Sequence, residues 1–224
     1  MKSLSLKASC LCGGIKFKTE GSHRDVQNCH CSQCMKTHGH HAAYTNVEEQ
    51  NIKFIRKLVG PKPIISSVVK GNAYGHGIKD FVPLAESCGV NHFSVFSQDE
   101  AYKVKKYSNK KSTIMIMGAL HYADINWVIK NDIEFYLFNL TRFTIALKSA
   151  KRLKKKMCIH IELETGMNRT GFSQEELPEL ISLLKSNEEY VAIKGLCTHF
   201  AGAESISNYY RIKKQIKHFK ISKY

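Results

Sequence analysis

The sequence predicts an α/β protein built as an incomplete (β/α)8 TIM-type barrel of about six βα units, preceded by a small cysteine-rich β segment. From about residue 51 onward, short apolar runs alternate with longer helical patterns, as in a parallel sheet with right-handed crossovers. Earlier in the chain this alternation stops, and five of the eight cysteines lie within residues 10–34. We therefore divide the chain into a segment 1–47 and a barrel-like domain 48–224.

The expected strands lie at 64–70, 92–96, 112–117, 133–138, 157–163 and 191–198. The helical patterns that follow them span 78–88, 98–107, 122–130, 140–153, 174–187 and 205–220. Six such units are two short of a closed barrel of eight. Because barrel chemistry collects at the C-terminal ends of the strands, residues just beyond each expected strand are the candidates for a functional site.

The amino-acid composition argues against a membrane protein and against a nucleic-acid-binding protein. A chain of 224 residues with 43% hydrophobic content and 4 prolines is typical of a folded globular protein. No apolar run approaches the roughly 20 residues that cross a bilayer, and Met1–Lys7 lacks the apolar core of a signal peptide, so we expect a cytoplasmic protein without a membrane partner. The net charge of +15 comes mostly from lysines scattered along the expected helices. Without interleaved aromatic residues, these indicate solvated faces rather than a nucleic-acid site.

The N-terminal cysteines have the close spacing of metal ligands: Cys10, Cys12, Cys29, Cys31 and Cys34. The first two form a C-x-C pair ahead of an alternating strand that contains Ile15 and Phe17. The last three form a C-x-C-x-x-C group, whose C-x-x-C turn can direct two sulfurs to one tetrahedral zinc ion. Water or a nearby histidine could complete the coordination, the candidates being His38, His40 and His41.

Residues 6–46 resemble the start of the family named for glutathione-dependent formaldehyde-activating enzyme. The resemblance implies a structural zinc held by the C-x-C pair together with a later C-x-x-C pair, a catalytic zinc held by the C-x-C-x-x-C trio, and carbon-sulfur lyase activity. The later pair is absent, and about a third of that domain is present. We therefore interpret a metal bound here as structural or adventitious rather than catalytic. The isolated Cys88, Cys158 and Cys197 are interpreted as core thiols.

Lys70 is the leading catalytic candidate. It ends an apolar strand within the block Val68-Val69-Lys70-Gly71-Asn72-Ala73-Tyr74-Gly75-His76-Gly77. The glycines of this block allow the backbone to come close to a phosphate at the start of the next helix. A lysine at the mouth of an apolar strand loses hydration, which suits an amine that forms a Schiff base.

Two further blocks strengthen this interpretation. They are Ile159-His160-Ile161-Glu162-Leu163-Glu164-Thr165-Gly166-Met167-Asn168-Arg169-Thr170-Gly171-Phe172 and Gly195-Leu196-Cys197-Thr198-His199-Phe200-Ala201-Gly202-Ala203-Glu204. In this order and at these separations, the three blocks resemble the bacterial alanine racemase family of the pyridoxal-phosphate class. The resemblance runs from about residue 51 to the end of the chain. It implies a barrel that binds pyridoxal 5'-phosphate at its strand ends, alanine as the small-molecule substrate, D-alanine supply for peptidoglycan, and a homodimer completed by a β-rich domain.

The resemblance also implies a role for individual residues. Lys70 would bond the cofactor and act as acid and base on one face of the substrate α-carbon, and Tyr74 would contact the cofactor phosphate. Arg169 would meet the substrate carboxylate region with its planar fork. His199 would lie against the cofactor ring. Glu162 stands where many members carry a carbamylated lysine, and its native carboxylate could orient Arg169.

Three elements of that family's site have no counterpart in the sequence: a serine-glycine phosphate loop, an arginine facing the pyridine nitrogen and an opposing tyrosine base. Racemisation needs an acid-base group on each face of the α-carbon. We therefore expect a fused or truncated form that binds the cofactor weakly and racemises little by itself, and the family's homodimer stays open for this chain. The alternatives are a zinc-dependent carbon-sulfur lyase and a non-catalytic pyridoxal-phosphate-binding barrel.

Overall fold

The computed structural model describes residues 50–109, 111–202 and 206–222, together with the backbone of four short strands nearer the N-terminus. These strands are β1 (Ser5–Ser9), β2 (Lys16–Glu20), β3 (Gln27–Cys29) and β4 (Ala42–Tyr44). They form two separate antiparallel pairs, β1 with β2 and β3 with β4. The strand expected around Ile15 and Phe17 corresponds to β2.

The proposed zinc ligands lie almost wholly outside the described residues. Of the five cysteines, Cys29 is described by its backbone only, at the end of β3, and the others fall outside: Cys10, Cys12, Cys31 and Cys34. The same holds for the alternative histidine ligands. The zinc site therefore stays a prediction. Within the described part of the chain, no three His, Cys, Asp or Glu side chains gather as metal ligands would.

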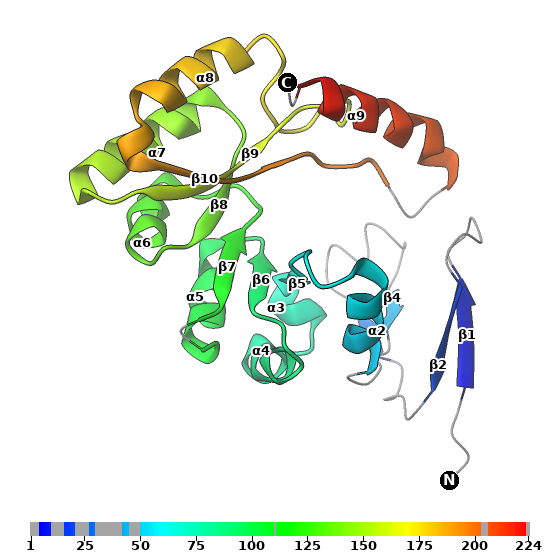
Figure 1. Cartoon of the computed structure of the whole chain (residues 1–224). Coiled ribbons are helices and arrows are strands. Elements are labelled where there is room, and N and C mark those ends of the chain that lie inside the picture. Colours follow the sequence, from blue (N-terminus) through cyan, green and yellow to red (C-terminus); the bar gives the residue numbers. More distant parts are fainter. Residues whose placement is uncertain are drawn as a thin grey trace.

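The main sheet has six parallel strands in the order β10-β9-β8-β7-β6-β5 (Figure 1). They are β5 (Ser67–Val68), β6 (His92–Val95), β7 (Thr113–Ile116), β8 (Glu134–Leu137), β9 (Met157–Glu162) and β10 (Val191–Cys197). Each strand pairs with its neighbour in sequence, and β5 and β10 form the two edges. The prediction of an α/β fold with an open, barrel-type parallel sheet is confirmed.

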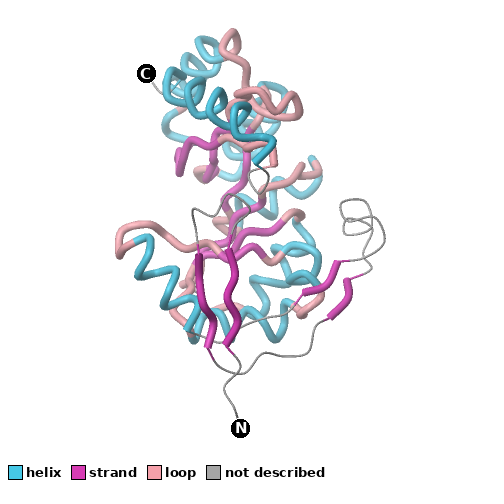
Figure 2. Tube along the Cα trace, turned by 90° about the vertical axis from the view of Figure 1, so that its right-hand side faces the viewer, coloured by secondary structure: helices cyan, strands magenta, loops and turns pink. Residues whose placement is uncertain are grey.

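Six of the described helices follow the strands as predicted, whereas the two at residues 50–59 and 70–74 were not predicted. The described helices are α2 (Gln50–Val59), α3 (Lys70–Tyr74), α4 (Ile78–Ser87), α5 (Gln98–Tyr107), α6 (Ile125–Lys130), α7 (Leu140–Leu153), α8 (Leu177–Ser186) and α9 (Tyr209–Ser222). Short 3₁₀ turns at Tyr122–Asp124, Glu188–Tyr190 and Ile206–Asn208 precede α6, β10 and α9. Figures 1 and 2 show α4 to α8 on the outside of the sheet. Within the described ranges, no helix is both long and apolar enough to cross a membrane.

Several boundaries differ from the prediction, two of them at the first strand and the last helix. The first barrel strand was expected over 64–70, yet β5 contains only Ser67–Val68, because the backbone turns sharply at Lys70. The last helix was expected to begin at 205, yet α9 begins at Tyr209 after a 3₁₀ turn. The first difference matters for function, since it leaves Lys70 on a turn rather than within a strand.

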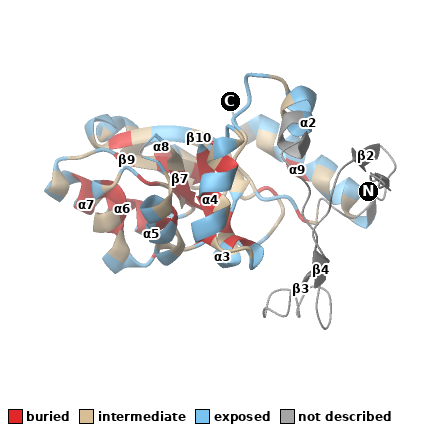
Figure 3. Ribbon diagram, turned by 90° about the horizontal axis from the view of Figure 1, so that it is seen from below, coloured by how far each residue is buried: buried red, intermediate tan, exposed pale blue. Residues whose placement is uncertain are grey.

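Side chains on one face of the sheet form the hydrophobic core beneath the helices. Successive strand residues point to opposite faces. The set that faces the helices is apolar and fully buried, and includes Phe93, Val95, Ile116, Phe135, Leu137 and Ile159. Helix residues such as Val104, Phe143 and Ala146 belong to the same cluster. Figure 3 shows the buried residues concentrated where the helices meet the sheet.

The opposite face of the sheet is polar. Glu134 at the start of β8 accepts a hydrogen bond from His160 of β9, with 2.6 Å between Oε2 and Nε2, and its Oε2 lies 3.8 Å from Nε2 of His92 on β6. His92 Nδ1 lies 2.7 Å from the Ser66 hydroxyl, which in turn lies 2.6 Å from the Ser94 hydroxyl. The network thus reaches from β9 to the residue before β5. It therefore connects the segment at the β5 edge of the sheet with β9.

The Glu134 carboxylate is ionised in this network. Burial alone would raise the pKa of Glu134, but the hydrogen bonds and positive charges of His160 and His92 outweigh burial and hold the pKa at about 2. Its side chain is only 12% exposed, so solvent screens these interactions weakly. The carboxylate therefore contributes stability at mildly acidic pH above 4.5, the ordinary pKa of the group, and this contribution is lost as the pH falls from 4.5 towards 2.

We predict that Glu134→Gln lowers the free energy of unfolding by about 2–3 kcal/mol at pH 6, because breaking a largely buried ion pair leaves its partners unpaired. Since the folded-state pKa lies below the ordinary value, the difference from the wild type should shrink as the pH falls from 4.5 towards 2. Urea unfolding at a series of pH values measures both effects. Glu189→Gln, at an exposed position, is the control. A Glu134→Gln stability equal to that of the wild type at pH 6 would contradict the prediction.

Candidate functional site

Lys70 stands at the start of a left-handed backbone turn. The four residues after it have positive φ angles: Gly71 (61°), Asn72 (55°), Ala73 (56°) and Tyr74 (53°). Left-handed backbone costs roughly 1–2 kcal/mol for each residue that carries a Cβ. Such a run persists only where its surroundings compensate, and strained backbone of this kind concentrates at functional sites.

Hydrogen bonds within the block hold this turn. The Ala73 N–H donates to the Val69 carbonyl at 2.8 Å, and the Gly77 N–H donates to the Asn72 carbonyl at 3.0 Å. The Asn72 side chain accepts from the N–H of Ile78, the first residue of α4, at 3.1 Å. The turn places the Lys70 ammonium 6.0 Å from the centre of the Tyr74 ring. The two residues thus lie next to each other at the C-terminal end of β5.

The loop after β9 positions Arg169. The Glu164 carboxylate accepts backbone hydrogen bonds from Gly166, from Asn168 at 2.9 Å and from Arg169 at 3.4 Å. Burial would raise the pKa of Glu164, but these N–H donors outweigh it and lower the pKa. Gly171 closes the loop with φ +119°, where an added Cβ would lie 2.5 Å from the Glu164 nitrogen. These contacts hold the backbone of the loop, including that of Arg169, in a compact turn.

Glu162 lies beneath that loop at the end of β9. It is 3% exposed, and burial raises its pKa, while a hydrogen bond from the Thr170 side chain and the charge of Arg169 partly oppose the rise. A buried carboxyl without this support would favour its neutral form more strongly. The arrangement places a carboxyl group where it interacts electrostatically with Arg169.

His199 is affected by charged groups from both sides of the sheet. It follows β10 by two residues, and its pKa is lowered by burial and then by the positive charges of Arg169 and Lys70. Arg169 belongs to the loop after β9, and Lys70 to the turn after β5 at the opposite edge of the sheet. Both charges therefore act on one imidazole, which the lowered pKa keeps neutral at pH 7. The structure places Lys70, Tyr74, Glu162, Arg169 and His199 at the C-terminal end of the sheet.

A half-buried thiol lies below this cluster. Burial, followed by the charge of Glu162, raises the pKa of Cys197 to about 12, while a hydrogen bond from the Tyr136 hydroxyl opposes the rise. Burial also raises the pKa of Cys158. Both residues are free thiols that stay protonated at neutral pH, in agreement with their interpretation as structural rather than reactive.

Sequence reasoning missed Gln215, a fully buried residue of α9. Its side-chain oxygen accepts from the Ala201 N–H at 2.9 Å. Its amide nitrogen donates to the His199 carbonyl at 2.7 Å and to the Thr165 hydroxyl at 3.3 Å. One side chain thus joins α9 to the loops after β9 and β10. Nothing in the sequence near residue 215 points to this role, because its partners are far away in the chain.

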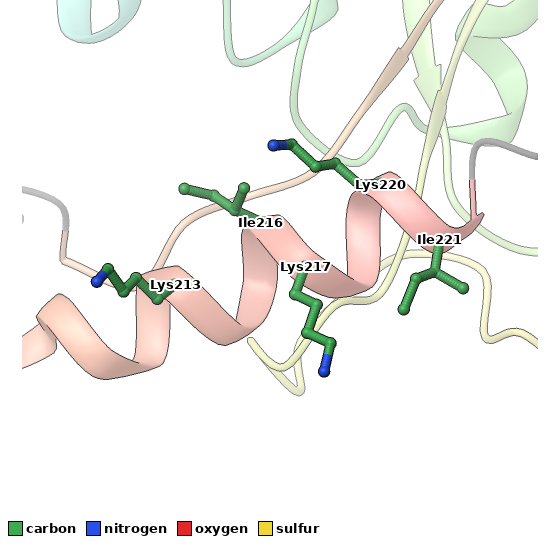
Figure 4. Close-up of a pocket in the computed structure, with 5 residues that line it drawn as sticks. All are labelled: Lys213, Ile216, Lys217, Lys220 and Ile221. Carbon is green, nitrogen blue, oxygen red and sulfur yellow. The ribbon is translucent and has the colours of Figure 1, made fainter.

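A shallow hollow along α9 is separate from this cluster (Figure 4). Its lining comes from a single helix: Lys213, Ile216, Lys217, Lys220 and Ile221. None of the candidate site residues contributes to it. The chemistry of the site therefore lies at the strand ends and not in this hollow.

We predict that Gln215→Leu destabilises the protein by about 2–4 kcal/mol, because the buried Ala201 N–H and His199 carbonyl lose their partner. Urea unfolding gives the free energy, and amide hydrogen exchange at Ala201 reports the local loss. The exposed neighbour Lys214, changed to Leu, is the control. Equal stability of the two variants would show that Gln215 does not hold the loops.

Comparison with known proteins shows the family to which the chain is similar. The model of "Alanine racemase, N-terminal domain" matches residues 48–223. Alanine racemase of Campylobacter jejuni strain RM1221 is 31% identical over 170 residues, which are 75% of this chain and 46% of that protein. Alanine racemase of Methanococcus maripaludis is 31% identical over 163 residues, 72% of this chain and 43% of that protein. The chain thus spans less than half the length of these relatives.

Solved structures agree. Alanine racemase of Clostridium difficile 630 superposes with a TM-score of 0.70 at 29% identity, covering 78% of this chain and 45% of that one. Alanine racemase from Oenococcus oeni gives a TM-score of 0.69 at 25% identity, with 78% and 49% coverage. These matches and the family model concern the same domain that carries Lys70, Arg169 and His199, and the chain belongs to the alanine racemase family through the N-terminal domain of that family.

Proposed function

We propose that the domain 48–224 provides the lysine half of a pyridoxal-phosphate-dependent alanine racemase site, which interconverts L- and D-alanine for cell-wall precursor supply. The observation that carries the proposal is that Lys70, Arg169 and His199 lie in the loops that follow β5, β9 and β10, where the parallel strands end. The charges of Arg169 and Lys70 also lower the pKa of His199. The names of the relatives support alanine as the substrate.

The residues fit an anionic, aldehyde-bearing cofactor. Lys70 and Arg169 supply positive charge for phosphate and carboxylate groups, and the Tyr74 side chain is 42% exposed beside Lys70. His199 is uncharged, so an aromatic ring can lie against it without burying a second positive charge. When bound, pyridoxal phosphate supplies the aldehyde that joins an amino-acid nitrogen and a ring that makes the α-hydrogen acidic.

Lys70 has two roles in this proposal. Its amine would hold the cofactor through the aldehyde, and the same nitrogen would act as acid and base on a proton at the substrate α-carbon. A single amine can serve only one face of that carbon. Racemisation needs a second group on the other face, which in the resembling family is a tyrosine of the β-rich domain.

Arg169 and its support orient the substrate. The guanidinium can bind a carboxylate through two parallel hydrogen bonds. Glu164 fixes the backbone around Arg169. The carboxyl group of Glu162 interacts electrostatically with the Arg169 guanidinium. Tyr74 is proposed as a phosphate contact and His199 as the surface beneath the ring. The zinc hypothesis for the N-terminal cysteines and the family's homodimer remain predictions.

We predict that the 224-residue chain, given pyridoxal phosphate, exchanges the α-hydrogen of one alanine enantiomer with solvent deuterium, with retention and with little racemisation. One acid-base group suffices for exchange, whereas racemisation uses two, each contributing roughly 10²–10⁴-fold. Proton NMR measures exchange, and chiral chromatography measures D-alanine formed from L-alanine. Lys70→Ala should abolish exchange, while Lys79→Ala, at an exposed lysine of α4, should keep it.

Other outcomes decide between the hypotheses. Borohydride trapping of the cofactor on Lys70 without any exchange would favour a non-catalytic pyridoxal-phosphate-binding barrel. Exchange that survives in Lys70→Ala would overturn the role given to this residue. Robust racemisation by the 224-residue chain would show that a second acid-base group acts within it.

A further inference from the structure

A second carboxylate, Glu100, contacts the turn that carries Lys70. Glu100 lies in the first turn of α5, and its Oε1 accepts the Gly71 N–H at 2.6 Å. Its Oε2 accepts the Phe96 N–H at 2.9 Å. The Glu100 N–H itself donates to the Ser97 hydroxyl, which caps α5, at 3.4 Å. One side chain thus joins the β5–α3 turn to the β6–α5 turn through both of its oxygens.

The hydrogen bond from Gly71 to Glu100 lies directly beside Lys70. Gly71 follows Lys70 directly and is the first residue of the left-handed run. Hydrogen bonds from backbone N–H groups to a charged carboxylate are among the stronger ones in proteins. Glu100 therefore fixes the backbone at the point where it turns away from the strand. The direction in which Lys70 leaves the backbone depends on that point.

The edge strand needs such support. β5 contains two residues, and Val68 within it is 38% exposed. Beyond β5, the Val69 N–H donates to the Ser94 carbonyl of β6 at 2.8 Å. A short edge strand followed by strained backbone is a poorly anchored place for a lysine that must meet a bound group accurately.

We propose that Glu100 is a positioning residue for Lys70: by holding the Gly71 N–H, its carboxylate sets where the Lys70 amine stands. The inference rests on the proposed function, since it assigns Glu100 to the same site. Glu100 does not touch the reacting atoms. It acts through the backbone of its neighbour, so its removal should misplace the amine without altering the amine itself.

The chain contains a matched control. Glu86 of α4 makes the same kind of contact elsewhere, accepting the Asn109 N–H at 2.8 Å and the Ser112 hydroxyl at 2.5 Å. It joins α4 to the segment before β7 and makes no hydrogen bond to the turn after Lys70. Glu86→Gln therefore removes the charge of another carboxylate that accepts two hydrogen bonds, both through Oε1, and the comparison separates positioning from a general loss of stability.

The test uses the full 224-residue chain with pyridoxal phosphate and borohydride, and peptide mass spectrometry gives the rate of trapping at Lys70 relative to Lys79. In the wild type, Lys70 should react faster than Lys79. Glu100→Gln should slow trapping at Lys70 by about tenfold, because small displacements of a reacting group are costly. Glu86→Gln should leave the Lys70 preference unchanged, and Glu100→Asp should restore part of it. Amide hydrogen exchange at Gly71 should rise in Glu100→Gln alone.

The outcomes are distinguishable. If Lys70 is preferred equally in wild type and Glu100→Gln, the inference is overturned while the proposed function stands. If Glu86→Gln slows trapping as much as Glu100→Gln, the effect is general destabilisation and the inference is again overturned. If the wild type shows no preference for Lys70, the proposed function fails, and the role of Glu100 fails with it.

Discussion

Parallel alignment of the six strands is the constraint on which the site depends. In a parallel sheet every strand ends at the same edge, so residues far apart in sequence meet there. Lys70 follows the first strand of the sheet and His199 the last, and the charge of Lys70 nevertheless lowers the pKa of His199. An antiparallel arrangement of the same segments would send alternate loops to opposite ends and separate these groups.

Carboxylates that accept backbone N–H groups also support the site. Glu164 gathers the loop around Arg169, and Glu100 joins the turn after Lys70 to the neighbouring loop. Both the loop and the turn contain residues with left-handed backbone, which is unfavourable without compensation. A charged acceptor stabilises such backbone because it binds N–H groups that no strand or helix satisfies. The backbone at each of the two positively charged candidates, Lys70 and Arg169, is thus held by a carboxylate that accepts main-chain N–H groups.

The polar face of the sheet adds a different kind of support. Ser66, His92, Glu134 and His160 come from four segments of the sheet, and the contact between His92 and Glu134 passes over β7. Gly195 on β10 belongs to the same arrangement, since an added Cβ there would lie 2.9 Å from Nδ1 of His160. The absence of a side chain at this position, next to a register shift in β10, gives the His160 ring its space. Polar groups therefore fix the relation between strands on this face, while apolar packing does so beneath the helices.

The sequence alone determined the order and type of the elements of the barrel-like domain, because apolar periodicity and strand-to-helix alternation are local properties. It also indicated Lys70, Tyr74, Glu162, Arg169 and His199 as candidate site residues, since each lies in or beside a contiguous motif, and their roles stay predictions. Only the tertiary structure revealed the side chains whose partners are distant in sequence: Glu100, Glu134 and Gln215, which contact residues 29, 26 and 50 positions away. The short extent of β5 was likewise a tertiary outcome, because apolar residues 64–69 favour a strand while contacts from α5 and β6 hold the turn that ends it. Local patterns specify which residues can do chemistry, and long-range hydrogen bonds decide where those residues stand.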